Sequence, residues 1–309
     1  MLDPRKLRIL VAVAASGSIA GAAASAGCSA AAASQQLSAL ERQTGAQLLE
    51  RSARSVRLTA AGELLVEHAT RILADLEAAE QAVVATGTLL GGRLRVASFG
   101  TAAARLCMPA LAAFARRYPK VALTFHEVEP EQSIPAVRAG EIDLAITHQY
   151  ARFPEPDLRG LAQVHLLTDP LLLAVPARLR PADAAPVSLR AFADAEWIAT
   201  SPTEGFQAIA EMVGRAAGFE PKVTCRADDY SVILDLVAAG LGVALVPELA
   251  VAPRAGVTML AIAQPPRLAR NIHVTTRSAD KSPAVARMAQ QLIERRHRAG
   301  SHGAFAVGR

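Results

Sequence analysis

The hydrophobic pattern at the start of the chain predicts short helices. The first helix has apolar residues at helical spacing, at Leu7, Leu10, Val11 and Ala14. A Ser-Gly-Ser run at 16–18 ends this helix and offers Ser18 as the N-cap of a second one over residues 19–25. The chain therefore opens with two helices separated by a tight break.

A third helix and two short strands follow. Gly27 supplies a turn, and Ser29 can cap a helix with a buried stripe at Ala33, Leu37 and Leu40. Two helices joined by a tight glycine turn form a helix-turn-helix. The segments at 48–52 and 55–58 then predict two short strands around a tip that carries Arg54, which is the arrangement of a wing.

A single long helix is expected after the wing. Thr59 is a suitable N-cap, and no Pro or Gly occurs between Glu63 and Thr86. An apolar seam recurs at alternating spacings of four and three residues, at Leu65, Ala69, Ile72, Leu76, Ala79 and Val83. This seam favours self-association through the helix, and packing against a later part of the same chain is the alternative.

The remaining chain alternates between predicted strands and helices. Glycines between 87 and 92 indicate a hinge. Strands are expected at 93–98, 121–127, 142–147, 171–175, 197–199, 222–225 and 243–246, and helices at 102–117, 133–139, 206–217 and 231–239. This alternation predicts a mainly parallel α/β sheet, and about 210 residues are enough for two lobes.

Composition and charge refine this division. Apolar residues make up 51% and charged residues 20% of the chain, as in ordinary globular proteins. Basic residues outnumber acidic ones seven to three in residues 1–58, whereas acidic residues outnumber basic ones five to one in 59–90. A basic head that binds a polyanion, followed by an acidic segment, explains this distribution.

An export signal is the main alternative for the N-terminus. Lys6 precedes an apolar stretch at 9–15, and Ala-Gly-Cys at 26–28 resembles a lipoprotein cleavage site. However, Asp3 lies in the region that should be basic, and 16–18 interrupts the apolar run. The three cysteines fit neither a disulfide framework nor a metal or redox pair, and no apolar stretch approaches 18 residues, so a cytoplasmic protein without a membrane partner is expected.

Specific local sequences in the first 62 residues resemble the winged head of LysR-type transcriptional regulators. They are Gly17-Ser18-Ile19, Ala22-Ala23, the segment 29–34, Leu40-Glu41, the segment 48–51 and the segment 58–62. The resemblance implies a winged helix-turn-helix DNA-binding domain over 1–58 and a linker or dimerisation helix over 59–89. It also implies binding to double-stranded DNA as a homodimer or a homotetramer, with RNA polymerase as a further partner.

The third helix differs from the family where it would meet DNA. It opens with four alanines at 30–33, where the family often has Gln and Pro, so few side chains are left to contact bases. Gln36 can bond an adenine edge, and the alternative is a solvated helix residue. The expected DNA contacts are Ser18, Ser29, Ser34, Gln35, Gln36, Arg51 and Arg54.

Two later segments, 140–146 and 237–247, resemble the effector-binding domain of the same family, which is built like type 2 periplasmic binding proteins. This implies a domain over 90–300, with lobe I at 91–163 and 267–298 and lobe II at 164–266. The tail at 301–309 is expected to be disordered, because it shows no apolar periodicity.

A ligand is expected beyond the carboxyl ends of strands. The candidate residues are Ser98, Phe99, Thr101, Thr147, His148, Thr200, Ser201, Asp229 and Tyr230. Phe99 stands where the family commonly has Ser, which favours a small carboxylate with an apolar body. Lobe packing is the alternative role for His148 and Tyr230.

No catalytic motif accompanies these residues. The chain has no G-x-S-x-G sequence, no phosphate-binding glycine loop and no metal spacing among its seven histidines. A ligand-responsive DNA-binding regulator, without enzymatic activity, metal or cofactor, is the leading hypothesis. A solute-binding lipoprotein that uses residues 1–28 for export and a small-molecule enzyme on the same scaffold are the alternatives.

Overall fold

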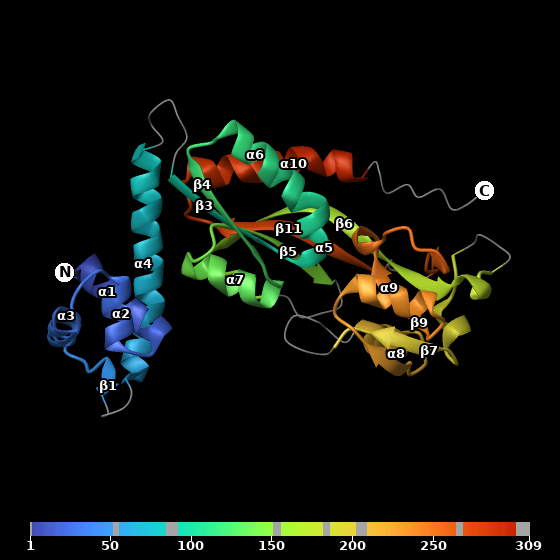
Figure 1. Ribbon diagram of the computed structural model, residues 1–309, viewed down its shortest axis with the longest axis horizontal. Helices are drawn as coiled ribbons and strands as arrows, with labels where there is room; N and C mark the ends of the chain where they lie inside the picture. The colour runs from blue at the N-terminus through green and yellow to red at the C-terminus, as the bar shows by residue number, and fades with distance from the viewer. Residues whose placement is uncertain are drawn as a thin grey trace.

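The computed structural model describes residues 2–51, 56–84, 92–150, 156–181, 186–201, 209–263 and 268–300. The chain forms a small helical head, one long helix and a two-lobed α/β part (Figure 1). The long helix lies between the head and the α/β part and contacts both. The predicted fold class, a winged helix-turn-helix head with a long helix and a two-lobed α/β domain, is confirmed.

Capped helices and a short antiparallel pair of strands make up the head. They are α1 (Pro4–Ser16), α2 (Ile19–Ser25), α3 (Ala30–Thr44), β1 (Leu49–Arg51) and β2 (Val56–Leu58). Both predicted N-caps are present. Ser18 Oγ accepts a hydrogen bond from the Gly21 N–H at 3.0 Å, and Ser29 Oγ accepts one from the Ala32 N–H at 3.2 Å. These bonds satisfy N–H groups that the first turn of a helix leaves free.

The buried faces of the head helices were predicted correctly for α3 and only in part for α1. The buried stripe of α3 consists of Ala33, Leu37 and Leu40, as predicted. Of the apolar residues that recur at helical spacing in α1, Leu7 and Leu10 are buried, Val11 is partly buried and Ala14 is exposed. Ile9 and Val13 are buried instead, because α1 contacts α2, α3 and α4 and so packs on more than one side.

The first half of α4 (Ala60–Val84) belongs to the head. Thr59 holds its start, since Thr59 Oγ1 accepts from the Gly62 N–H at 3.0 Å and donates to the Gln47 carbonyl at 2.7 Å. Ala69 is fully buried in the head core, and Leu65 packs against that core. These two members of the predicted apolar seam are therefore covered within the same chain.

The second half of α4 docks on the α/β part. Gly140, with φ +79°, follows α7 (Pro130–Ala139), and a Cβ built at this glycine would overlap the Cβ of Ala74. Close by, Arg93 Nη2 donates to Glu77 Oε2 at 2.6 Å. The glycine at 140 leaves room for α4 to come close, and the ion pair between Arg93 and Glu77 holds α4 against the start of the sheet.

The strands of both lobes form one connected path. They are β3 (Gly92–Ser98), β4 (Val121–Glu127), β5 (Leu144–Tyr150), β6 (Leu161–Pro176), β7 (Glu196–Ala199), β8 (Lys222–Arg226), β9 (Val243–Pro247), β10 (Val257–Leu260) and β11 (Ala269–Arg277). Their order is β4-β3-β5-β11-β6-β9-β7-β8, and β10 also pairs with β6. The sheet is mixed rather than mainly parallel as predicted, because β6 and β11 cross between the lobes antiparallel to their neighbours.

Helices cover the sheet in layers. The helical segment after β3 contains α5 (Gly100–Ala102), a π-helical turn (Ala103–Cys107) and α6 (Met108–Arg117). In lobe I, α6 and α10 (Pro283–Gly300) lie together on one side and α7 lies on the other (Figure 1). In lobe II, α8 (Ile209–Ala216) and α9 (Tyr230–Ala238) contribute to separate cores, around Trp197 and Ile198 respectively.

Candidate functional site

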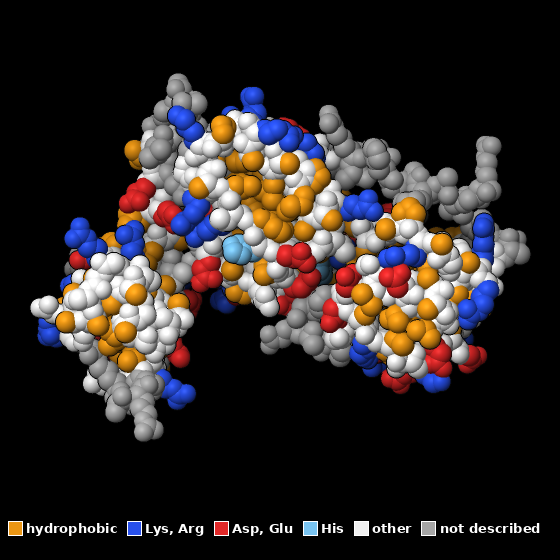
Figure 2. Space-filling model, in the orientation of Figure 1, with side chains coloured by type: hydrophobic (Ala, Val, Ile, Leu, Met, Phe, Trp, Pro, Cys, Tyr) orange, Lys and Arg blue, Asp and Glu red, His pale blue; other side chains and the backbone are white. Residues whose placement is uncertain are grey.

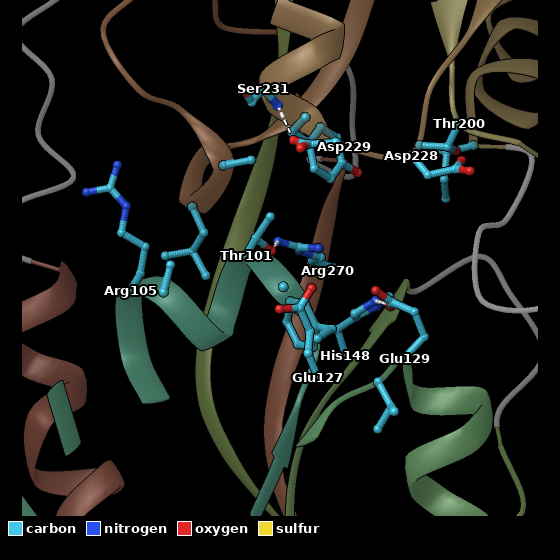
Figure 3. A pocket seen from close by; sticks show the side chains of 18 of the residues that line it. Thr101, Arg105, Glu127, Glu129, His148, Thr200, Asp228, Asp229, Ser231 and Arg270 are labelled. Atoms are coloured by element: carbon cyan, nitrogen blue, oxygen red, sulfur yellow. Dashed lines mark hydrogen bonds and ion pairs between the residues drawn. The ribbon is translucent and has the colours of Figure 1, made fainter. Parts of the chain in front are cut away.

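A cavity of about 840 Å³ opens between the lobes, where β3, β4 and β5 end and α9 begins. It has the size typical of small-molecule sites. Both lobes contribute to its wall (Figure 3). The lining residues are Phe99, Gly100, Thr101, Ala104, Arg105, Glu127, Val128, Glu129, Gln132, His148, Tyr150, Thr200, Ile209, Asp228, Asp229, Tyr230, Ser231, Leu249, Ala250, Ala252 and Arg270.

Arg270 is a buried cation in this wall. The strand register places it between Tyr150 on β5 and Asp169 on β6. Its Nε donates to Asp169 Oδ2 at 2.8 Å, and its Nη2 donates to Thr101 Oγ1 at 2.6 Å. The guanidinium also lies 4.8 Å from the centre of the Phe99 ring. These contacts leave the Thr101 hydroxyl hydrogen available to a ligand, since its oxygen already accepts a bond.

Asp169 joins the two lobes beneath the cavity. Its other oxygen, Oδ1, accepts from the backbone N–H of Leu249 at 3.0 Å. Burial raises the pKa of the Asp169 carboxyl, and the Arg270 charge and the Leu249 N–H oppose that shift. Asp169 is only 1% exposed, so the group that compensates the Arg270 charge lies inside the protein.

His148 forms an uncharged part of the wall. Burial lowers its pKa, against the hydrogen bond with Glu129, so the ring is neutral at neutral pH. Its Nε2 lies 3.3 Å from Glu129 Oε2, and its ring meets Phe99 edge to face at 4.6 Å between centroids. With Nε2 as the donor to Glu129, the buried Nδ1 is an acceptor that has no hydrogen-bond partner among the described residues.

Lobe II supplies polar groups on the opposite side. Asp229 caps α9 by accepting from the Ser231 N–H at 2.7 Å. Asp228 Oδ1 accepts from the Ser201 N–H at 2.8 Å, which fixes the end of β7 beside the cavity. Burial raises the pKa of Tyr230 well above its ordinary value, so this residue remains a neutral phenol.

Six of the nine residues expected at the ligand site line the cavity: Phe99, Thr101, His148, Thr200, Asp229 and Tyr230. Ser98, Thr147 and Ser201 do not. Ser98 is fully buried, and its hydroxyl donates to the Phe99 carbonyl at 3.2 Å. Thr147 Oγ1 lies 2.8 Å from Thr275 Oγ1, because it points to the other side of β5 from His148. Ser201 contributes only its backbone N–H, to Asp228.

The sequence reading missed several charged or polar residues of this wall. Glu127 ends β4 and Glu129 follows it, so the rule that ligands sit beyond strand ends would have found them. Arg270 gives no such signal, since it lies within β11, an antiparallel crossing strand. The others are Arg105, Gln132, Tyr150, Asp228 and Ser231.

The expected DNA contacts gather on the head. In Figure 1, α3 lies on the side of the head away from the α/β part. Gln35 is exposed and Gln36 is partly buried on this helix. Ser18 and Ser29 cap α2 and α3, and Ser34 is partly buried. Arg51 ends β1, whereas Arg54 lies outside the described residues.

The apolar seam of α4 divides into two parts. Ala69 is enclosed in the head core, so it is not available to a partner helix, and Leu65 is half-buried there. By contrast, Ile72, Ala79 and Val83 are exposed, as is Leu64. Leu76 is partly buried. The exposed residues leave an apolar stripe along the described part of this helix.

Metal and membrane sites are not found in the described ranges. No group of three or more His, Cys, Asp or Glu side chains there could hold a metal ion. None of the helices in those ranges combines the length and hydropathy that spanning a bilayer requires.

Comparisons with known proteins agree with this geometry. Residues 4–63 match the family model described as "Bacterial regulatory helix-turn-helix protein, lysR family", and residues 87–296 match "LysR substrate binding domain". The transcriptional regulator TfdS of Cupriavidus pinatubonensis is 34% identical over 80% of this chain and 82% of its own length. ClcR of Pseudomonas putida is 30% identical, over 80% of this chain and 83% of its own.

Solved structures resemble the whole chain. A full-length OxyR variant from Pseudomonas aeruginosa has a TM-score of 0.73 at 23% identity and covers 94% of this chain and 95% of its own. Full-length CbnR in complex with its target DNA has a TM-score of 0.60 at 26% identity, with coverage of 96% and 100%.

Proposed function

Because the chain belongs to the LysR family of helix-turn-helix transcriptional regulators, we propose that an effector in the cavity between its lobes changes how the head engages DNA. The chain is a DNA-binding regulator with an effector-binding domain, and its relatives are transcriptional regulators. The observation that carries the proposal is the hydrogen bond from the buried Arg270 to Thr101, in a cavity lined by both lobes.

A ligand there contacts Thr101 from lobe I and the start of α9 from lobe II. Closing the lobes on it favours one arrangement of the α/β part over another, and differential affinity of this kind is all that allosteric control requires. Glu77 and Ala74 of α4 lie against lobe I, so the change reaches the helix that carries the head.

The N-terminal half of α3 is the proposed reading surface. Gln35 and Gln36 meet base edges, Ser18, Ser29 and Ser34 meet phosphates or bases, and Arg51 and Arg54 of the wing meet the backbone. The regulator works in the cytoplasm and has no catalytic activity. It associates through the exposed stripe of α4 into dimers or tetramers, and RNA polymerase is its further partner.

Genomic fragment retention followed by gel-shift titration tests the DNA-binding assignment. Affinity for a retained fragment should fall steeply with salt, because Lys and Arg contacts displace counterions. Gln36→Ala should reduce the preference for that fragment over unrelated DNA, at a cost of roughly 1 to 3 kcal/mol for a bidentate base contact. Gln43→Ala, two turns further along α3, is the matched control. Equal preference in both variants would assign base recognition to other residues.

A further inference from the structure

Carboxylates outnumber cations around the cavity. The acidic lining residues are Glu127, Glu129, Asp228 and Asp229, and the basic ones are Arg105 and Arg270. Arg270 is already paired with Asp169 at 2.8 Å. Arg105 reaches away to the carbonyl of Val251, to which its Nη2 donates at 2.8 Å. A ligand with two negative charges would therefore face a wall of its own sign.

The acidic groups come from both lobes. In Figure 3, Glu127 lies below Thr101 and Arg270, whereas Asp228 and Asp229 lie across the cavity from it. Figure 2 shows acidic side chains gathered along the boundary between the lobes. A charge between these positions would interact with carboxylates on two sides.

In the described ranges, no cation neutralises Glu127. Its carboxylate has no hydrogen-bond or ion-pair partner in the described part of the chain. It lies beside the start of α5, since a Cβ added at Gly100 would be 3.0 Å from Glu127 Oε1. By contrast, the acids across the cavity accept hydrogen bonds from backbone groups. Asp229 accepts from the Ser231 N–H and Asp228 from the Ser201 N–H.

A second observation also points to a ligand that donates hydrogen bonds. The His148 side chain is 10% exposed and lines the cavity, and its Nδ1 has no partner among the described residues. With Nε2–H donated to Glu129, this ring adds an acceptor and no positive charge to the wall. The His148 Nδ1 is therefore an acceptor that a hydrogen-bond donor of the ligand could satisfy.

We propose that the effector is an amphoteric small molecule, with an anionic group at Arg270 and Thr101 and a protonated amine or guanidinium facing Glu127, Asp228 and Asp229. This effector class rests on the proposed effector cavity. It narrows the expected effector from carboxylates in general to carboxylates that also carry a positively charged group. The arrangement suits an amino acid, whose two charged ends meet opposite charges within one cavity.

A thermal-shift panel on the full-length protein tests the class. The panel contains the proteinogenic amino acids, diamines such as 1,4-diaminobutane, and dicarboxylates such as succinate and muconate. We expect a saturable shift with at least one amphoteric probe and none with the dicarboxylates. Stabilisation by a dicarboxylate or a diamine alone, or no shift with any amphoteric probe, would overturn the proposal.

Glu127→Gln then locates the cationic end by calorimetric titration of the amphoteric probe that shifts the protein most. Loss of one charge-assisted contact should weaken that probe about tenfold or more. Glu220→Gln, an exposed acid of lobe II outside the cavity, should leave its affinity unchanged. Unchanged affinity in Glu127→Gln would overturn the assignment of the cationic end.

Different results contradict the effector class and the cavity assignment. If a dicarboxylate binds and Thr101→Val weakens it, the cavity stands and the amphoteric class fails. If an amphoteric probe binds with the same affinity in both Thr101→Val and Glu127→Gln, the cavity assignment itself fails. DNA binding by the head is measured separately and does not depend on either result.

Discussion

Single residues beneath the cavity hold charge where water is excluded. Arg270 and Asp169 are 2% and 1% exposed, and each also bonds to a second group, Thr101 and the Leu249 N–H. A buried pair of this kind contributes little net stability compared with apolar residues, but breaking it leaves an uncompensated charge. Its value here is positional, because it holds the Thr101 hydroxyl in the cavity wall.

Asp169→Asn should therefore lower the free energy of unfolding by about 3 to 5 kcal/mol, since it leaves the buried Arg270 charge without its partner. Urea unfolding of the full chain measures this loss. Asp157→Asn is the control, because its pair with Arg159 lies at the surface and should leave the unfolding midpoint unchanged. Similar midpoints for both variants would show that Arg270 is compensated in some other way.

Among these residues, the sequence predicted members of the cavity wall that lie near strand or helix ends and missed those that do not. Thr101 and Asp229 follow or precede elements whose ends are visible as changes of hydrophobic pattern. Arg270 and Asp169 lie inside crossing strands, and only the register of β6 against β11 brings them together. Pairing between segments about a hundred residues apart leaves no trace in local periodicity.

Among the elements, the contact of α4 with lobe I is unusually close. The backbone of Gly140 meets Ala74, and the adjacent ion pair joins Glu77 to Arg93. Interfaces that lack space for a methyl group do not deform gradually, and so they pass a change of position from one element to the next. This contact is the route by which the proposed effector would influence the head.

Gly140→Ala should disturb this contact more than its backbone conformation alone would predict. Gly160→Ala is a matched control, since both glycines have a positive φ, +79° and +76°, but nothing lies within 4 Å of a Cβ at Gly160. Strain should cost each variant about 1 kcal/mol, and overpacking against Ala74 should add roughly 1 to 3 kcal/mol at Gly140 only. Urea unfolding measures both, and adding Ala74→Gly should restore part of the loss. Equal losses without that rescue would show that α4 moves away freely.

Elements were predictable where local hydrophobic pattern determines them. The stripe of α3 and the strand β4 agree with their predicted positions. β6 begins at Leu161 although only 171–175 was expected, since Asp169 and Pro170 separate its first half from the apolar run at 171–175. Such a segment becomes a strand through its neighbours β11 and β9 rather than through its own composition.

In the whole molecule, α4 contacts both the head and lobe I, so it links the head to the part of the chain that carries the proposed effector cavity. The exposed stripe of this helix contains Ile72, which is 43% exposed, and the more exposed Val83. A stripe of this kind gains stability from a second copy of the same helix, because burying apolar surface from both chains is favourable. Two heads would then be held at a fixed separation.

Ile72→Asp should break that association without unfolding the protomer, because the side chain is half-exposed in the single chain. An unpaired charge at the interface costs on the order of 3 kcal/mol or more. Sedimentation of the variant should show monomers. Val232→Asp, at a similarly exposed apolar residue of α9, should keep the parent mass. An unchanged mass for Ile72→Asp would place the contact on another surface.

The path of β6 and β11 also bears on how the chain is made. During synthesis from the N-terminus, β5 and β6 emerge long before β11, the strand that pairs with both of them. The rest of lobe II is translated while the edges of β5 and β6 that pair with β11 are still open. Open strand edges can pair with other chains. A ribosome that stalled before residue 269 would release a polypeptide with a gap in the middle of its sheet. Newly made chains should therefore depend most on chaperones in the interval between the completion of β6 and the arrival of β11.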